Sequence, residues 1–261
     1  MTAWLLIDAG NSRLKCASWR AGRISRQRYR EVAGDSARAS AKWLRAQFAT
    51  RFDRILISSV ASAERNRALA RAIYSAFGQR AEFARVRASA AGVRCGYAQP
   101  WRLGVDRWLA VLAAAHVESR RTGCLVVDAG TALTIDLIDQ YRKHRGGLIV
   151  PGAAMMRSSL HGRTAGIAKR ARGTGLSNGD AWGRDTATAI DRGAHLALVA
   201  LIERCHQNAL RDLGQRPRVV LTGGDSGELQ VLLSLDTQRV EDLVLRGLLV
   251  LATRANASHF E

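Results

Sequence analysis

Cysteine and proline are scarce in this 261-residue chain, which contains four cysteines and three prolines. The cysteines lie far apart in the sequence and form no Cys-x-x-Cys pair, which argues against a disulfide framework and against a cysteine-ligated zinc site. We therefore expect reduced and mostly buried thiols at the four positions Cys16, Cys95, Cys124 and Cys205.

Long hydrophobic runs are also absent, although 47% of the residues are hydrophobic. No stretch approaches the roughly 18 apolar residues that a membrane span needs. The short apolar run after Met1 has no basic segment before it and soon reaches Asp8, which is not the pattern of a secretory signal. The sequence predicts a cytoplasmic protein without a membrane partner, with apolar material for one large or two smaller domains.

Acidic residues and lysines are few beside the arginines, since 22 acidic residues face 40 basic ones and only four of these are lysines. The net charge of +18 suits a nucleic-acid-binding surface, but it equally suits a solvated, arginine-rich surface. The arginines are spread along the whole chain, with no dense basic block and no aromatic-rich RNA-binding motif. Nucleic acid is therefore not the expected partner, while a positive field would attract anionic substrates.

One pattern occurs twice in the chain. An apolar run that ends in Asp-Ala-Gly and a small polar residue occupies residues 5–12 and again residues 125–132. In each copy a buried strand would deliver a carboxylate, the glycine would admit a close backbone approach, and a hydroxyl or amide would contact an oxyanion. One copy alone is equally compatible with a tight hairpin capped by the aspartate. Two copies at equivalent positions favour a two-lobed nucleotide-binding core that grips a polyphosphate and its metal from both sides.

The two halves of the sequence predict the same order of elements, which is strand, turn, two further strands, and then helices with more α/β structure. In the first half we expect strands at 4–7, 14–19, 23–29 and 55–60 and helices at 63–77 and 104–118. In the second half we expect strands at 124–127, 133–138, 144–150 and 218–221, a helix opened by Pro151, a loop over 165–180, and helices at 186–210, 228–233 and 244–252. The division falls near residues 115–123, which places the lobes at 1–118 and 119–261.

Two further segments are more specific. One is the Tyr-x-x-Pro-x-x-Leu-Gly-x-Asp-Arg string from Tyr97 to Arg107, and the other is Gly-Gly-Leu-Ile-Val-Pro-Gly at residues 146–152. With the Asp-Ala-Gly-Asn-Ser motif at Asp8 and the Asp-Ala-Gly-Thr-Ala-Leu-Thr motif at Asp128, this set resembles the type III pantothenate kinases, a group that includes the Bvg accessory factors. The resemblance covers nearly the whole chain.

The resemblance implies a fold and a reaction. The fold is α/β, with two ribonuclease-H-like lobes of the acetate and sugar kinase, heat-shock ATPase and actin superfamily. The reaction is the ATP-dependent phosphorylation of pantothenate at its primary hydroxyl, the first step towards coenzyme A. The resemblance also implies a homodimer, a requirement for Mg²⁺, and a monovalent cation, K⁺ or NH₄⁺.

By the same resemblance, the first motif binds the phosphates of ATP. Asp8 would hold magnesium directly or through water, because a hard dication prefers oxygen ligands. Lys15 would supply a point charge, although a solvent-facing strand residue fits its position as well. The expected ATP-binding residues are Asp8, Ala9, Gly10, Asn11, Ser12, Arg13, Leu14, Lys15 and Thr131. Asp128 matches the ligand of the monovalent cation, whose preference for oxygen a carboxylate satisfies.

Asp106 matches the catalytic base, which would accept the proton of the attacking hydroxyl. Its alternative role is to cap the predicted helix or to pair with Arg107. Arg107 would form a fork with the substrate carboxylate, or else be one surface arginine among many. The expected substrate-binding residues are Tyr97, Gly104, Val105, Asp106, Arg107 and Thr186.

Several of these residues have ordinary structural alternatives. Without the resemblance, Tyr97 would be read as a core aromatic residue. Thr186 could equally cap its helix, and Thr188 is a near competitor for the substrate contact. The Thr-Gly-Gly-Asp sequence at 222–225 would lie beside adenosine, or form a plain strand-to-helix turn. His161, His195 and His206 show no metal-ligand spacing, so we assign no zinc.

Two other functions stay open at the level of sequence. The first is a regulatory or nucleic-acid-binding protein that keeps the kinase fold, which the net charge of +18 and the accessory-factor name motivate. The second is another kinase or a phosphatase of the same fold with a different small substrate, because a fold alone does not define a substrate.

Overall fold

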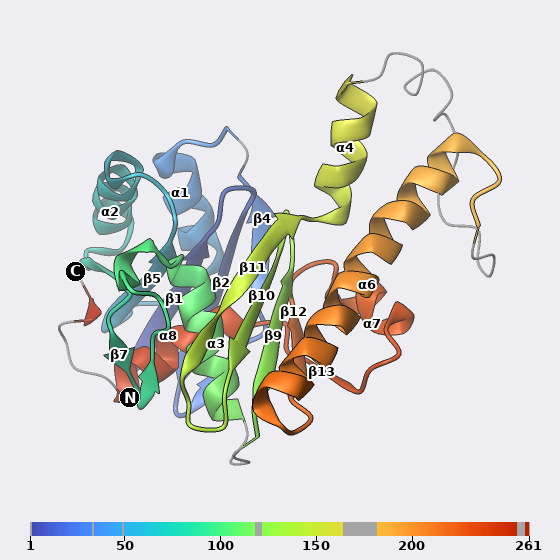
Figure 1. The fold of residues 1–261 in the computed structure, drawn as a ribbon. Helices are drawn as coiled ribbons and strands as arrows, with labels where there is room; N and C mark the ends of the chain where they lie inside the picture. Colours follow the sequence, from blue (N-terminus) through green and yellow to red (C-terminus); the bar gives the residue numbers. More distant parts are fainter. Residues whose placement is uncertain are drawn as a thin grey trace. The chain divides into compact units, whose positions relative to one another are not determined.

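The computed structural model describes residues 2–32, 34–48, 50–117, 122–163, 182–254 and 259–260. The predicted loop at 165–180 lies outside these described residues. The chain divides into two compact units, the first formed by residues 1–120, 142–145 and 242–261, and the second by 121–141 and 146–241. Each unit is built around one mixed β-sheet (Figure 1).

The sheet of the first unit has the order β3-β2-β1-β5-β6, with β4 pairing β2. The central strand β1 is antiparallel to β2 and parallel to β5, which is in turn parallel to β6. The strands are β1 (Ala3–Ala9), β2 (Arg13–Arg20), β3 (Arg23–Ile24), β4 (Arg28–Glu31), β5 (Arg54–Ser59) and β6 (Ala81–Phe83).

The predicted third strand at 23–29 is wrong as a single element, because the structure divides it into β3 and β4. Both short strands pair with β2. Between them, the backbone amide of Ser18 donates to the side-chain hydroxyl of Ser25 at 3.0 Å instead of to a strand carbonyl. This side-chain bond interrupts the regular ladder that one continuous strand would have formed.

Helices cover both faces of the first sheet (Figure 1). On one face α1 (Ala37–Gln47) and α2 (Ala63–Phe77) pack against Leu5 and Ile7 of β1. On the other face, α3 (Val105–Val117) and α8 (Leu243–Arg254) contact the sheet. Because successive side chains of a strand point to opposite faces, Leu6 and Asp8 lie on the α3–α8 face.

The helix α1 was not predicted, although its sequence carries the signals of a helix. Ser36 caps its first turn by accepting a hydrogen bond from the amide of Ala39 at 3.2 Å, and Ala41 and Leu44 form a short apolar face. The predicted helix at 63–77 is confirmed as α2, with Ser62 as its N-cap and Gly78 in the left-handed conformation at its end.

A small hairpin precedes α3 in the first unit. It consists of β7 (Ser89–Ala90) and β8 (Val93–Arg94), and the 3₁₀ helix η1 (Pro100–Arg102) follows it. At Gly96 the chain passes so close to another segment that an added Cβ would lie 2.0 Å from the carbonyl oxygen of His144. Only glycine permits this approach, which brings the neighbouring Tyr97 against the residues that enter β11.

The second unit repeats the strand plan of the first. Its sheet has the order β11-β10-β9-β12-β13, and the central β9 is again antiparallel to one neighbour and parallel to the other. The predicted duplication of layout is therefore confirmed. The strands are β9 (Cys124–Ala129), β10 (Ala132–Ile138), β11 (His144–Pro151), β12 (Arg218–Thr222) and β13 (Thr237–Arg239).

The described residues of the second unit form the helices α4 (Ala153–Arg163), α6 (Thr186–Leu213) and α7 (Ser226–Leu232). Residues of all three pack with alternate residues of β9, such as Leu125 and Val127. The prediction that Pro151 opens a helix is wrong, since Pro151 ends β11 and α4 starts after Gly152. A proline is tolerated there because β11 is an edge strand of its sheet.

The C-terminal helix α8 packs in the first unit, whereas the predicted lobe at 119–261 includes it in the second. The reason is a close contact with α3, where a Cβ added to Gly247 would lie 2.1 Å from the carbonyl oxygen of Leu109. Small residues allow two helices to approach this closely. The apolar side of α8, including Leu248 and Leu251, is fully buried.

Three of the four cysteines are buried and all four are free thiols, as predicted. Burial raises the pKa of the Cys16 thiol to about 12. Among the described residues, no helix combines the length and the hydropathy that crossing a membrane requires.

The contact at Gly247 provides a test of the α3–α8 packing. We expect Gly247→Ala to lower the free energy of unfolding by about 1–3 kcal/mol, because the added methyl overlaps the backbone of α3. The matched control is Gly193→Ala within α6, where an added Cβ meets no atom within 4 Å and should stabilise the helix by up to about 1 kcal/mol. Urea unfolding followed by circular dichroism measures both, and a Gly247→Ala variant as stable as the parent would contradict this packing.

Candidate functional site

Asp8 lies near the end of β1 with a polar residue beside it on each neighbouring strand. Its register partners are Lys15 on β2 and Ser58 on β5. Partners in register share a face of the sheet, so the carboxylate, the ammonium and the hydroxyl lie together on the α3–α8 face. Asp8 is 8% exposed, Ser58 is fully buried and Lys15 is half-buried. Lys15 is thus partly, and not fully, exposed to solvent.

The loop from Gly10 to Ser12 joins β1 to β2. Its turn is closed by the amide of Gly10, which donates to the carbonyl of Arg13 at 3.1 Å. The Asn11 side chain is exposed at the tip of this loop. The carbonyl of Ser12 accepts a hydrogen bond of 3.0 Å from the amide of Val32. The loop thus presents an amide and a hydroxyl on a backbone that is held at both ends.

Two of the predicted ATP-binding residues, Ala9 and Leu14, do not share the face of Asp8. Leu14 is buried in the apolar cluster under α1 and α2, and Ala9 packs against the same cluster. Arg13 does share this face with Lys15, and its guanidinium lies over the ring of Tyr29, 5.6 Å from the centroid. Any contact of Ala9 and Leu14 with ATP would therefore involve their backbone atoms.

The second unit presents an equivalent arrangement around Asp128. Its register partners are Thr134 on β10 and Thr222 on β12. These three residues lie on the face opposite the one that packs against α4, α6 and α7, because they alternate with the buried Val127, Leu133 and Leu221. Where Asp8 has a lysine and a serine beside it, Asp128 has two threonines. One carboxylate and two hydroxyl oxygens therefore meet at this position.

Two glycines bring separate loops close to the Asp128 hairpin. A Cβ added to Gly152 would lie 2.1 Å from the carbonyl oxygen of Gly130, and the Gly152 amide donates to the carbonyl of Thr131 at 2.9 Å. Gly223 has a φ of +94°, and a Cβ there would lie 2.5 Å from Oδ1 of Asp128. The glycines of the 146–152 segment and of the 222–225 turn thus have a physical role, which is to admit these contacts.

Asp106 stands in the first turn of α3. Its Oδ1 accepts a hydrogen bond of 2.7 Å from the amide of Arg107, so one oxygen contributes to the helix end as the structural alternative predicts. A Cβ on Gly104 would lie 2.6 Å from the same oxygen. The glycine therefore leaves room for the carboxylate, which is half-buried.

Arg107 is 6% exposed, so it is not one surface arginine among many. Its guanidinium donates a hydrogen bond of 3.0 Å to the hydroxyl of Tyr97. The Tyr97 ring is stacked on the ring of His144, with centroids 5.9 Å apart and an angle of 15° between the planes. Tyr97 is half-buried, so it is not the core aromatic residue of the alternative interpretation. The three side chains form one packed group beside Asp106.

Thr186 is the first residue of α6, and Asp185 is the N-cap. The amide and hydroxyl of Thr188 donate to the Asp185 carboxylate at 2.9 and 2.6 Å. These hydrogen bonds lower the pKa of Asp185, the hydroxyl bond being the larger cause. Capping therefore engages Thr188 rather than Thr186, which distinguishes the two threonines.

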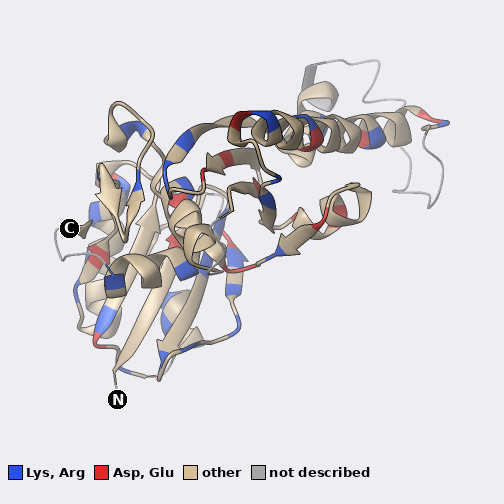
Figure 2. Ribbon diagram, turned by 60° about the horizontal axis from the view of Figure 1, so that its bottom comes forward, with Lys and Arg blue, Asp and Glu red and all other residues tan. Residues whose placement is uncertain are grey.

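The basic residues are distributed widely in both units. Figure 2 shows Lys and Arg on strands, helices and loops of each unit rather than gathered on one element. Several arginines have local structural roles, as in the ion pairs of Arg54 with Glu82 and of Arg157 with Asp191, both at 2.6 Å. Part of the positive charge in the described residues is thus engaged in local contacts.

Sequence reasoning missed the residues that flank the two aspartates. Ser58 and Thr134 were not assigned to the site, Thr222 was expected only in the turn beside adenosine, and His144 was not assigned either. A signal was present for the first three, because each is a hydroxyl residue within or at the end of an apolar run. Their proximity to an aspartate depends on the register between strands, which one strand's sequence does not contain.

Comparisons with known proteins identify the relatives of this chain. A model of the type III pantothenate kinase family matches residues 4–208. The type III pantothenate kinase of Alkalilimnicola ehrlichii is 35% identical over 97% of this chain and 98% of that protein. The type III pantothenate kinase of Laribacter hongkongensis is 38% identical over 95% of this chain and 98% of that protein.

Solved structures support the fold at lower identity. A Baf family protein from Campylobacter jejuni is 21% identical and has a TM-score of 0.59, covering 93% of this chain and 94% of that one. Component A of the (R)-2-hydroxyglutaryl-CoA dehydratase of Acidaminococcus fermentans is 14% identical, with a TM-score of 0.52 and 98% of each chain covered. The predicted fold class is confirmed.

The strained turn at Gly223 provides a test of the Asp128 arrangement. Gly223→Ala should lower the thermal unfolding temperature through a loss of about 1–3 kcal/mol, because the methyl meets both the Ala129 carbonyl and the Asp128 carboxylate. Gly227→Ala is the control, since an added Cβ there first meets the end of the flexible Arg239 side chain at 3.2 Å. Equal unfolding temperatures for the two variants in differential scanning fluorimetry would refute the tight turn.

Proposed function

The chain belongs to the type III pantothenate kinase family, and from this we propose how its residues perform the ATP-dependent phosphorylation of pantothenate, the first step of coenzyme A biosynthesis. The observation that carries the assignment is the family match over residues 4–208, which contains both aspartate hairpins and the Tyr97–Arg107 segment. Phosphoryl transfer requires chiefly that the reactants be positioned and their charge neutralised.

We propose that the first hairpin binds the ATP phosphates. The Lys15 ammonium and the Ser58 hydroxyl stand beside Asp8, and Asn11 and Ser12 follow in the loop. Asp8 fits a magnesium ion, directly or through water, because its carboxylate offers the oxygen donor that this hard cation prefers. Bound Mg²⁺ would neutralise phosphate charge, while Lys15 contributes a positive charge from the protein itself.

Asp106 is the proposed catalytic base. Because one oxygen already accepts the Arg107 amide, the carboxylate is held in one orientation and Oδ2 is the atom that would accept the proton of the substrate hydroxyl. Gly104 leaves space beside this carboxylate for the substrate. Orientation of the attacking oxygen is as important as proton removal, since the transition state of phosphoryl transfer is loose.

Arg107 and Tyr97 are proposed to bind pantothenate. A guanidinium suits a carboxylate, with which it makes two parallel hydrogen bonds. The bond from Arg107 to the Tyr97 hydroxyl holds both groups in place before the substrate arrives. Val105 would line the same site, and Thr186, whose helix is capped by Asp185 instead, would add a hydroxyl contact.

Asp128 is proposed to bind the monovalent cation, K⁺ or NH₄⁺. The carboxylate and the hydroxyls of Thr134 and Thr222 form an all-oxygen donor set, which suits a hard cation. The exposed Thr131 at the tip of the hairpin would contact ATP. The cation would supply positive charge close to this second hairpin.

A homodimer and a cytoplasmic location are further parts of this proposal. Support for the dimer comes from apolar side chains exposed on β11 and α4, which are Leu148, Ile149, Met155 and Leu160. Exposed apolar side chains on neighbouring elements are typical of subunit interfaces. The free and mostly buried thiols support the cytoplasmic location.

Loss of the proposed base should abolish turnover without unfolding the protein. In a coupled assay of ADP release, Asp106→Asn is expected to lower the pantothenate-dependent kcat by about 10²–10⁴-fold, with an unchanged unfolding temperature. The control Glu64→Gln removes the acidic group in the first turn of α2 and should leave kcat as it is. Full activity of Asp106→Asn would exclude it as the base, and a folded parent without pantothenate-dependent turnover would overturn the function.

The cation proposal is tested in the same assay by exchanging potassium for sodium. Turnover of the parent protein should rise with potassium, and Asp128→Asn should lose this dependence because the charged ligand of the cation is gone. The sodium-supported rate and the KM for pantothenate should change much less. If the variant responds to potassium as the parent does, Asp128 is not the ligand of the cation.

A further inference from the structure

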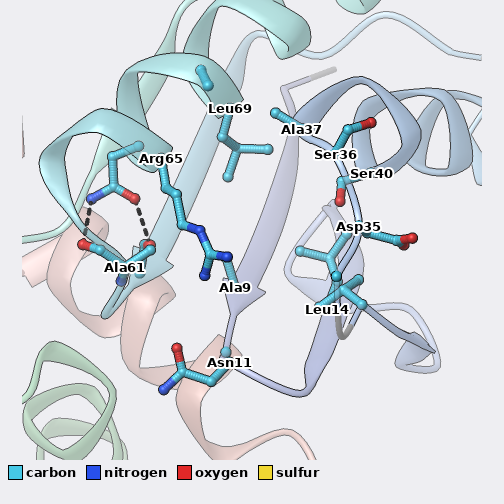
Figure 3. A pocket seen from close by; sticks show the side chains of 16 residues that line it. Ala9, Asn11, Leu14, Asp35, Ser36, Ala37, Ser40, Ala61, Arg65 and Leu69 are labelled. Carbon is cyan, nitrogen blue, oxygen red and sulfur yellow. Dashed lines mark hydrogen bonds between the residues drawn. The ribbon is translucent and has the colours of Figure 1, made fainter.

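A cavity of about 340 Å³ lies in the first unit, between α1, α2 and the loop that follows β1 (Figure 3). It is situated at the carboxyl ends of the parallel strands β1 and β5, where Ala9 and Ser59 line it. Open α/β sheets bind ligands at this edge, and the volume is sufficient for a small organic molecule. Ala9, Gly10, Asn11 and Leu14 of the first motif line it, but the sequence motifs assign no role to its residues on α1 and α2.

The cavity is separate from the proposed phosphate site at Asp8. Its wall contains Leu14 and Leu69, which belong to the apolar cluster under α1 and α2. Asp8, Lys15 and Ser58 do not line it, since they lie on the opposite face of the same sheet. A molecule in this cavity would therefore contact the proposed phosphate-binding loop at Gly10 and Asn11, from the face of the sheet opposite Asp8.

The polar side chains of the cavity indicate the chemistry of its ligand. Figure 3 shows Arg65 extending from α2 towards Ala9, with its guanidinium inside the cavity. In the part of the chain that the structure describes, this guanidinium has no ion-pair partner within 4.0 Å. The nearby acid, Asp35, is paired with Arg30 instead. An anionic group on the ligand would form charge-assisted hydrogen bonds with the Arg65 guanidinium.

Ser40 provides a second and independent indication. It is 8% exposed, it lines the cavity, and Figure 3 shows its hydroxyl turned towards the interior. Within the described residues, no hydrogen bond of this hydroxyl is found. By contrast, the side chains of Ser36, Ser59 and Asn66 are engaged in hydrogen bonds of the protein itself. A hydroxyl that opens into the cavity and has unused hydrogen-bonding capacity is a group that a ligand oxygen would satisfy.

We propose that this cavity is a second ligand site, which binds a small molecule with a carboxylate or phosphate group and a short apolar part. Arg65 and Ser40 would hold the anionic group, and Leu14, Val32 and Leu69 would pack against the apolar part. Its occupation would change the affinity of the loop at Asn11 for ATP, and ATP would change the affinity of the site by the same factor. This coupling rests on the proposed kinase function, whereas binding does not.

The test is a nuclear magnetic resonance titration of the full chain, without nucleotide, with butyrate in one arm and n-butyl phosphate in the other. We expect amide shifts at the starts of α1 and α2, and the stronger arm identifies the anionic group. Arg65→Gln should weaken this binding about tenfold or more, because a charge-assisted hydrogen bond is lost. Arg67→Gln, two residues further along α2 and outside the cavity, should bind as the parent does.

Failure of the two proposals would be distinguishable. The pocket is refuted if neither probe shifts these amides, or if Arg65→Gln binds both probes as tightly as Arg67→Gln. Pantothenate-dependent turnover of Arg65→Gln without probe should equal that of the parent, since Arg65 has no part in the proposed mechanism. If the probes bind to a protein that shows no pantothenate-dependent turnover, the second ligand site is supported. Only the kinase function and the coupling to ATP are then rejected.

Discussion

The alternation of side chains along two central strands is the constraint on which the structure depends. In β1, Leu5 and Ile7 enter the apolar cluster under α1 and α2, so Asp8 must lie on the other face. In β9, Leu125 and Val127 are buried in the same way, and Asp128 lies on the other face. A shift of the strand register by one residue would bury each carboxylate in an apolar core. The register of both strands is therefore strongly specified.

Close backbone approaches bring the remaining parts of the site to these strands. At Gly96, Gly152 and Gly223 an added Cβ would lie 2.0, 2.1 and 2.2 Å from a neighbouring carbonyl oxygen, so only glycine lets the segments meet there. The first approach places Tyr97 against His144, and the last places the β12 turn beside Asp128. The glycines of the family motifs therefore act by allowing separate backbone segments to come into contact.

Prediction from the sequence was most successful where a segment carries its own signal. The apolar runs that became β1 and β9 and the helix at 63–77 were recognised because periodicity and capping are local. The strand at 23–29 was misjudged because the Ser25 hydroxyl accepts a hydrogen bond from the Ser18 amide, and this side-chain bond divides the strand. The helix α1 was missed because its alanine-rich sequence contains few large apolar residues to mark its buried face.

The sequence by itself determined the two aspartate hairpins, the repeated strand plan and membership of the kinase family, because these are patterns of neighbouring residues. Only the tertiary structure decided that Ser58 and Lys15 accompany Asp8, that two threonines accompany Asp128, and that α8 joins the first unit. It also decided that Arg107 is buried while Arg65 enters a cavity. The reason is physical: strand register and helix packing arise from contacts between segments far apart in the chain, and no single segment encodes them.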